Sequence, residues 1–175
     1  MFMWHKHKKG KLAKYTVGQK YMKMTTEIWN CLRNENKKFV SFCNGVGSKI
    51  GFWNKIFYHI IPDSIWFLNI TGASDLHDVG YSVPKTFKSY KDAFNYWNEV
   101  NEQFRDNLIM LIESRNSWKY IKEARLLRTS NYYKLLTAAI AWWSFISDKK
   151  ISGHKPTKIN AMKHYKRLME RNNAV

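Results

Sequence analysis

The sequence predicts an all-α fold, a helical domain with long loops and basic terminal extensions. Apolar residues recur three or four positions apart over long stretches, which is the period of an α-helix. The alternating pattern that is typical of half-buried strands is weak throughout. Of the 175 residues, 45% are hydrophobic and 16% are aromatic. This apolar content is typical of a chain that folds around a core and excludes a disordered one.

The clearest expected helix begins at Ser89 or Asp92, either of which can cap it, and runs to about Glu113. A shorter helix is expected before it over Thr71–Tyr81, ended by Pro84. The longer helix carries one apolar stripe with helical spacing, which predicts its buried face. The stripe consists of Ala93, Trp97, Val100, Phe104, Leu108 and Leu111.

Four further helices are expected, over Glu27–Asn34, Ser117–Leu127, Asn131–Phe145 and Lys158–Glu170. Residues 39–62 are rich in Gly and aromatic residues without a clean period, and they are expected to form loops. The last helix is amphipathic. Its expected apolar side holds Ile159, Met162, Tyr165 and either Leu168 or Met169.

The net charge of +17 is concentrated at the two ends of the sequence. Lys and Arg outnumber Asp and Glu by 8 in residues 1–38, by only 2 in residues 39–148 and by 7 in residues 149–175. We therefore divide the chain into a basic N-terminal arm with a short helix, a central helical domain and a basic C-terminal helix. Basic ends favour anionic partners, either an anionic phospholipid surface, which the protein would bind peripherally, or nucleic acid or virion proteins. The alternative is a solvated surface that keeps the protein soluble.

No segment of the sequence predicts a membrane span or a signal peptide. The longest apolar run, Leu135–Ile146, has 12 residues, whereas a spanning helix needs about 20. The first residues carry charges with no apolar stretch behind them. Cys31 and Cys43 are the only cysteines, which excludes a disulfide framework.

A histidine, a carboxylate and a tyrosine lie close together on the expected helix over Thr71–Tyr81. His77 and Tyr81 are four residues apart and share a face, while Asp78 points about a quarter turn away. An imidazole can act as a general base near neutral pH, and a carboxylate can bind a hard cation such as calcium. Upstream, the glycine loop CNGVG (Cys43–Gly47) offers backbone groups unhindered by large side chains.

The order of these motifs resembles the phospholipase A2-like domain of small bacteriophage-encoded proteins. The chain reads NGVG at Asn44–Gly47, IPD at Ile61–Asp63 and LNITGASDLHDVGY at Leu68–Tyr81, where that family has NGCG, a VPD-like segment and LNIT-x-ACNxHDxxY. The similarity covers about Phe39–Phe145 and leaves the basic ends outside. The HDxxY signature is shared with secreted and with fungal or bacterial phospholipases A2, so its specificity is moderate.

The resemblance implies a calcium-dependent phospholipase A2-like hydrolase of the sn-2 ester of glycerophospholipids. His77 would take a proton from the attacking water, and the Gly45 N–H would stabilise the oxyanion together with calcium. Calcium binds six to eight oxygen ligands and readily accepts backbone carbonyls. The implied ligands are Asp78 and the backbone oxygens of Cys43, Gly45 and Gly47 or the side chain of Asn44.

Three positions depart from the family pattern. Val46 and Ser74 stand where the family has cysteines, so we expect them to be spatial neighbours without a bridge. Asn101 stands where the family has the Asp that holds the catalytic imidazole, with Tyr81 orienting that group. An amide can hydrogen-bond the ring but brings no charge to stabilise an imidazolium, so activity is expected to be weakened.

The main alternative is a catalytically silent descendant of the same fold. Such a protein would be a basic structural or nucleic-acid-associated virion protein, and its basic ends would serve that role equally well. In either case the expected location is the cytoplasm of an infected host cell or the virion itself.

Overall fold

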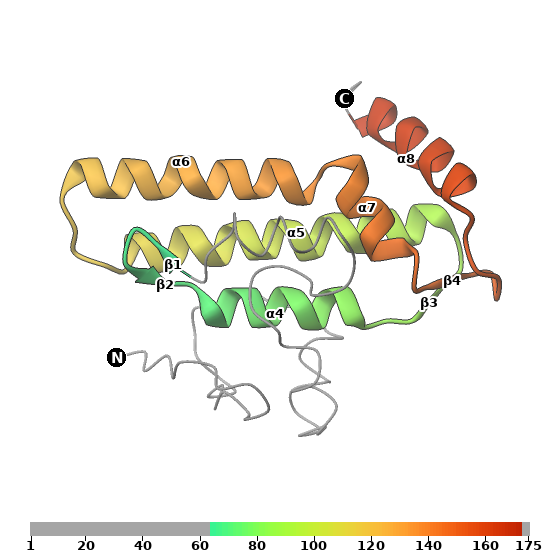
Figure 1. Ribbon diagram of the computed structural model, residues 1–175, viewed down its shortest axis with the longest axis horizontal. Coiled ribbons are helices and arrows are strands. Elements are labelled where there is room, and N and C mark those ends of the chain that lie inside the picture. The colour runs from blue at the N-terminus through green and yellow to red at the C-terminus, as the bar shows by residue number, and fades with distance from the viewer. Residues whose placement is uncertain (1–63, 173–175) are drawn as a thin grey trace, which may run out of the picture.

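The computed structural model describes residues 64–172, shown in Figure 1. These residues are mostly helical, as the sequence predicts, and they contain five α-helices. The expected helix over Glu27–Asn34 and the loop segment of residues 39–62 lie outside the described residues. The helices are α4 (Thr71–Ser82), α5 (Tyr90–Glu113), α6 (Lys119–Leu136), α7 (Ala139–Ile146) and α8 (Lys158–Asn172).

Two pairs of very short strands connect the helices. β1 (Ser64–Ile65) and β2 (Leu68–Asn69) form an antiparallel hairpin that leads into α4. β3 (Thr86–Phe87), between α4 and α5, pairs in parallel with β4 (Lys150–Ile151), between α7 and α8. Each strand has two residues, which agrees with the weak strand signal in the sequence.

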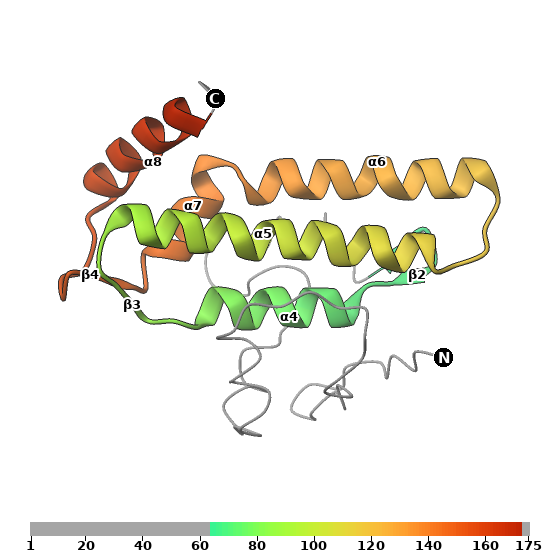
Figure 2. The same cartoon turned by 180° about the vertical axis from the view of Figure 1, so that it is seen from behind.

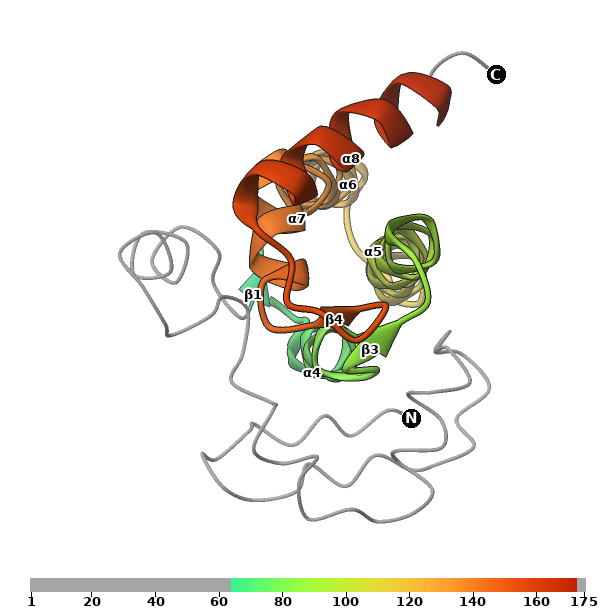
Figure 3. The ribbon, with the colours of Figure 1, turned by 90° about the vertical axis from the view of Figure 1, so that its right-hand side faces the viewer.

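α5 is the central element, and α4 and α6 run beside it on either side (Figures 1 and 2). Viewed along the long axis, α4, α5 and the α6–α7 pair surround a common interior, with α8 crossing above (Figure 3). The C-terminal half of α5 packs with the hairpin, α4 and α6 in one apolar cluster. Its N-terminal half packs with α7 and α8 in a second cluster. One helix therefore contributes to both parts of the core.

The beginning and the buried face of α5 are those that the sequence predicts. Ser89 is the N-cap, and its hydroxyl accepts a hydrogen bond from the backbone N–H of Asp92 at 3.1 Å. This bond satisfies one of the N–H groups that the first turn of a helix leaves unpaired. All six residues of the predicted stripe are buried, and Trp97 and Leu108 are completely inaccessible.

The region after α5 differs from the prediction of helices over Ser117–Leu127 and Asn131–Phe145. α6 runs without interruption from Lys119 to Leu136, because the polar residues between the two expected helices are accommodated within it. The hydroxyl of Thr129, for example, donates to the Arg125 carbonyl 3.0 Å away, one turn earlier. The break falls at Thr137–Ala138 instead.

The apolar side of α8 is only partly as predicted. Met162, Tyr165, Leu168 and Met169 pack against the second cluster, around the fully buried Ala161. Ile159, by contrast, is 81% exposed. It precedes Ala161 by two residues, which places it about 200° around the helix, on the solvent side. Among the described residues, no helix combines the length and apolar character that crossing a membrane requires.

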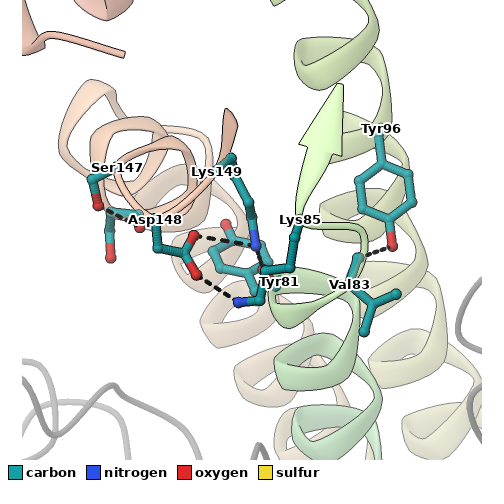
Figure 4. A network of polar contacts seen from close by, with 8 residues as sticks. Tyr81, Val83, Lys85, Tyr96, Ser147, Asp148 and Lys149 are labelled. Atoms are coloured by element: carbon teal, nitrogen blue, oxygen red, sulfur yellow. Dashed lines mark hydrogen bonds and ion pairs between the residues drawn. The ribbon is translucent and has the colours of Figure 1, made fainter. Parts of the chain in front are cut away.

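Lys149 is buried, although it is the first residue of the basic C-terminal region. Its ammonium donates to the Tyr81 carbonyl in the last turn of α4 and lies 3.2 Å from a carboxylate oxygen of Asp148 (Figure 4). Asp148 also pairs with Lys85 at 2.7 Å. Burial lowers the pKa of Lys149 to about 8, and the charge of Asp148 opposes that shift. These contacts fasten the segment after α7 to the end of α4.

Replacing Lys149 with Met tests whether this amine is truly buried. The pKa of Lys149 lies below its ordinary value of 10.5, so the folded protein releases the proton first. Wild type should therefore gain stability relative to Lys149→Met as the pH rises from about 8 to 10.5, by up to roughly 3 kcal/mol. Denaturant unfolding at several pH values measures this difference. The exposed neighbour Lys150 provides the control variant Lys150→Met, and an equal response from both would contradict the assignment.

Candidate active site

α4 directs His77 and Tyr81 towards α5. Their ring centroids are 4.1 Å apart, and the His77 ring also lies 5.0 Å from that of Phe104. The helix is held in place by Ala73 and Val79, which are fully buried. The shared face predicted for His77 and Tyr81 is thus the face that contacts the central helix.

A chain of hydrogen bonds joins the two helices at this point. The indole N–H of Trp97 donates to the Tyr81 hydroxyl at 2.8 Å, and that hydroxyl donates to Oδ1 of Asn101 at 3.0 Å. The Nε2 atom of His77 lies 3.1 Å from the same Oδ1. The Asn101 amide nitrogen donates to the Leu136 carbonyl at 3.2 Å. The expected contact between Asn101 and His77 is therefore present.

The direction of these bonds assigns the tautomer of His77. An indole N–H can only donate, so the Tyr81 hydroxyl accepts from Trp97 and uses its own proton on Asn101. The Leu136 carbonyl fixes the orientation of the Asn101 amide, because the opposite orientation would bring two oxygens together. Oδ1 can then only accept, and Nε2 of His77 must carry the proton. Nδ1 is left with the lone pair and is the atom that can take up a proton.

Burial keeps this group of side chains uncharged. Desolvation lowers the pKa of His77 to about 4, and the hydrogen bond to Asn101 offsets only part of that shift. Desolvation likewise raises the pKa of Tyr81 above its ordinary value, against the effect of the bonds from Trp97 and to Asn101. The negative charge of Asp78 adds to this rise. At neutral pH His77 is therefore a neutral imidazole.

The surroundings of Asn101 are matched to an amide. The side chain is completely buried on α5, and each of its two polar atoms has a partner of the right kind. A carboxylate here would place its second oxygen against the Leu136 carbonyl, which cannot donate. The last turn of α6 thus provides an acceptor that suits Asn and disfavours Asp.

Two participants in this site were missed by the sequence analysis. Trp97 was assigned to the apolar stripe, and the Leu136 carbonyl has no signature in a sequence. The position of Trp97, four residues before Asn101 on the same side of the helix, was the available signal. An indole on a buried stripe needs an acceptor for its N–H, and the nearby tyrosine provides it.

The glycine loop that would complete the expected calcium site lies outside the described residues. The predicted proximity of Val46 to Ser74 lies outside the described residues for the same reason. Ser74 itself is buried, and its hydroxyl donates to the Ile70 carbonyl within α4 at 3.2 Å. Asp78 is half-buried beside His77 and supplies a hard oxygen donor of the kind calcium accepts. The ligands outside the described residues are Cys43, Asn44, Gly45 and Gly47.

Between residues 64 and 172 no three His, Cys, Asp or Glu side chains gather in a way that could hold a metal ion. A site made of one carboxylate and several backbone carbonyls would not form such a group. The described chain also contains a cavity of about 410 Å³ between the starts of α5 and α8. Its lining includes Tyr90, His154 and His164 but none of the predicted site residues.

The protonation of His77 can be followed directly by nuclear magnetic resonance of its imidazole. We expect a titration midpoint near 4, with nitrogen shifts that report the Nε2–H tautomer. Asn101→Asp should raise the midpoint above the ordinary 6.5, because a carboxylate stabilises the imidazolium. A wild-type midpoint near 6.5 would show instead that the ring is solvated.

The Tyr81 hydroxyl should contribute to stability by connecting Trp97 to Asn101. Tyr81→Phe leaves the buried indole N–H of Trp97 without its acceptor, which should lower the free energy of unfolding by about 1–3 kcal/mol. Tyr120, 80% exposed, provides the control Tyr120→Phe, expected to be neutral. Denaturant unfolding compares the two variants. Equal stability of Tyr81→Phe and wild type would show that the hydrogen-bond chain is not formed.

No protein-family model, curated protein or solved structure matches the chain.

Proposed function

We propose that the protein is a weakened, calcium-dependent phospholipase A2-like hydrolase that cleaves the sn-2 ester of glycerophospholipids. The observation that carries the proposal is the position of His77. Its Nε2–H is held by Asn101, and its Nδ1 lone pair can accept a proton from water. The proposal also rests on the order of the glycine loop and the HDxxY motif in the sequence.

In this function His77 removes a proton from the attacking water while Asn101 fixes the ring. The neutral amide leaves the developing imidazolium without a compensating charge, and the pKa of about 4 makes the ring a weak base at neutral pH. Replacing the carboxylate of a comparable triad by an amide costs about 10⁴ in rate. Slow turnover is therefore expected.

Asp78 is the described residue that would hold calcium, with the loop carbonyls as further ligands. When bound, calcium would polarise the ester carbonyl and stabilise the oxyanion. The basic ends of the chain would bring the protein to anionic bilayers, since each well-placed Lys or Arg contributes about 1 kcal/mol.

A second function is favoured by one observation, the match between Asn101 and the Leu136 carbonyl. A buried amide with both polar atoms satisfied suits a role in stability, and no carboxylate is needed for it. In this function the protein is a catalytically silent, basic structural protein that associates with nucleic acid or with a virion. The two functions differ in whether the site turns over substrate.

The test is the release of fatty acid from anionic vesicles, with calcium and with a chelator. Slow hydrolysis that depends on calcium is expected for wild type. Asn101→Asp should raise the rate, because its charge stabilises the imidazolium, although the clash at Leu136 should lower its stability by about 1–3 kcal/mol. His77→Ala and Asp78→Ala should each abolish hydrolysis.

Asn95→Asp is the matched control, since it adds the same charge to an exposed position of α5. Its rate should equal that of wild type. If wild type and a folded Asn101→Asp variant both fail to release fatty acid in the presence of calcium, the hydrolase proposal is wrong and the structural function replaces it.

A further inference from the structure

The tip of the β1–β2 hairpin combines two features that folding alone does not favour. Trp66 and Phe67 form its two-residue turn, with φ values of 45° and 64°. Turns with positive φ at both positions normally contain Asn or Gly, because bulky side chains are disfavoured there. Both side chains also face solvent, 56% exposed for Trp66 and 97% for Phe67. Strained, exposed aromatic residues of this kind indicate a functional surface.

Other exposed aromatic side chains lie at the same end of the molecule. The hairpin and the start of α6 lie at the same end of the molecule in Figures 1 and 2. The Arg125 guanidinium connects them, since its Nη2 donates to the Trp66 carbonyl at 2.8 Å. Trp118 and Tyr120, at the start of α6, are 81% and 80% exposed. We call this region, with Trp66, Phe67, Trp118 and Tyr120, the hairpin end.

The charges around the hairpin end are mainly basic. Arg115, Lys119 and Lys122 lie beside its aromatic residues in the sequence. Two acidic residues, Glu113 and Glu123, are close by, and Glu123 is within 4.0 Å of Lys119. An anionic partner would therefore be attracted to this end.

Arg125 adds an observation of a different kind. Its side chain is only 8% exposed, yet neither Nε nor Nη1 has a hydrogen-bond partner among the described residues. Buried guanidinium groups are normally fully hydrogen-bonded. Because Nε and Nη1 are buried, a partner at the surface cannot reach them. Arg125 holds the hairpin against α6 and adds a positive charge to this end.

We propose that the hairpin end docks on the surface of an anionic phospholipid bilayer. Trp and Tyr favour the boundary between headgroups and acyl chains, and Lys and Arg beside them bind lipid phosphates. The aromatic side chains protrude from a turn and a helix start, which suits insertion into a lipid interface. The proposal adds a docking surface to the basic ends and needs no chemistry at His77, so it holds for a hydrolase and for a silent protein.

The experiment measures how the full chain partitions between water and sedimented vesicles of phosphatidylglycerol and phosphatidylcholine. A calcium chelator is present, so that hydrolysis does not change the lipid. The double variant Trp66→Asn/Phe67→Asn should bind at least about tenfold more weakly, because it removes the inserted apolar surface. Ile159→Asn is the matched control, with 81% exposure on α8, and should bind like wild type.

A second set of variants tests the contribution of positive charge, beginning with the pair Lys119→Gln/Lys122→Gln. This pair should lose about tenfold in binding to vesicles that contain phosphatidylglycerol. Lys88→Gln/Lys91→Gln removes the same charge from exposed positions near the start of α5, outside both basic ends, and should lose clearly less. Equal losses from both pairs would show that net charge alone drives binding and would overturn the assignment to the hairpin end.

The thermal stability of Phe67→Asn shows whether the Phe67 side chain is exposed or covered by protein. Asn tolerates a positive φ better than Phe, so the melting temperature should stay the same or rise while vesicle binding falls. A lower melting temperature would mean that Phe67 is covered by another part of the chain or by a second copy. That result, or unchanged vesicle binding by the double variant, would refute the proposal.

Discussion

The buried amide of Asn101 is the interaction on which the described structure depends most. It lies on the central helix, accepts hydrogen bonds from two side chains of α4 and donates one to the end of α6. Three helices are thereby held in one relative position by a single side chain. Leaving either polar atom of this buried amide without a partner would cost free energy, so the three contacts support one another. The same side chain determines the properties of His77, because it decides which ring nitrogen carries the proton and leaves the imidazolium without a counter-charge.

Helical periodicity predicted the parts of the fold that depend on one face of one helix. The stripe of α5 and its Ser89 cap follow from local spacing and capping chemistry, and both are found as expected. The continuity of α6 did not follow, because Thr129 can break a helix or bond back into it, and the sequence does not distinguish these. The exposure of Ile159 depends on where α8 meets α7, which is a tertiary property. In the site, the contact between His77 and Asn101 was expected from the resemblance, in which Asn101 stands where the family has the Asp that holds the imidazole. The roles of Trp97 and the Leu136 carbonyl depend on how α5 and α6 pack.

The site and the hairpin end illustrate two different ways of departing from an ideal fold. At Asn101 every polar side-chain atom has a hydrogen-bond partner, but the neutral amide leaves His77 a weak base. At the hairpin end the backbone of Trp66 and Phe67 and the side chain of Arg125 are left in unfavourable states. Departures of the first kind favour stability, whereas those of the second kind persist when something other than stability maintains them.

The contact between Lys149 and the last turn of α4 also bears on how the chain acquires its structure during synthesis. The two residues that it joins are 68 positions apart, and the parallel pairing of β3 with β4 closes a loop of similar length. Neither contact can form until the segment after α7 has left the ribosome. The hairpin, α4, α5 and α6 therefore emerge before the elements that fix the end of α4. Among the described elements, the first compact state of the growing chain can use the contacts that these four make with one another. Closing so long a loop late favours a slow final step, in which the position of α4 becomes fixed.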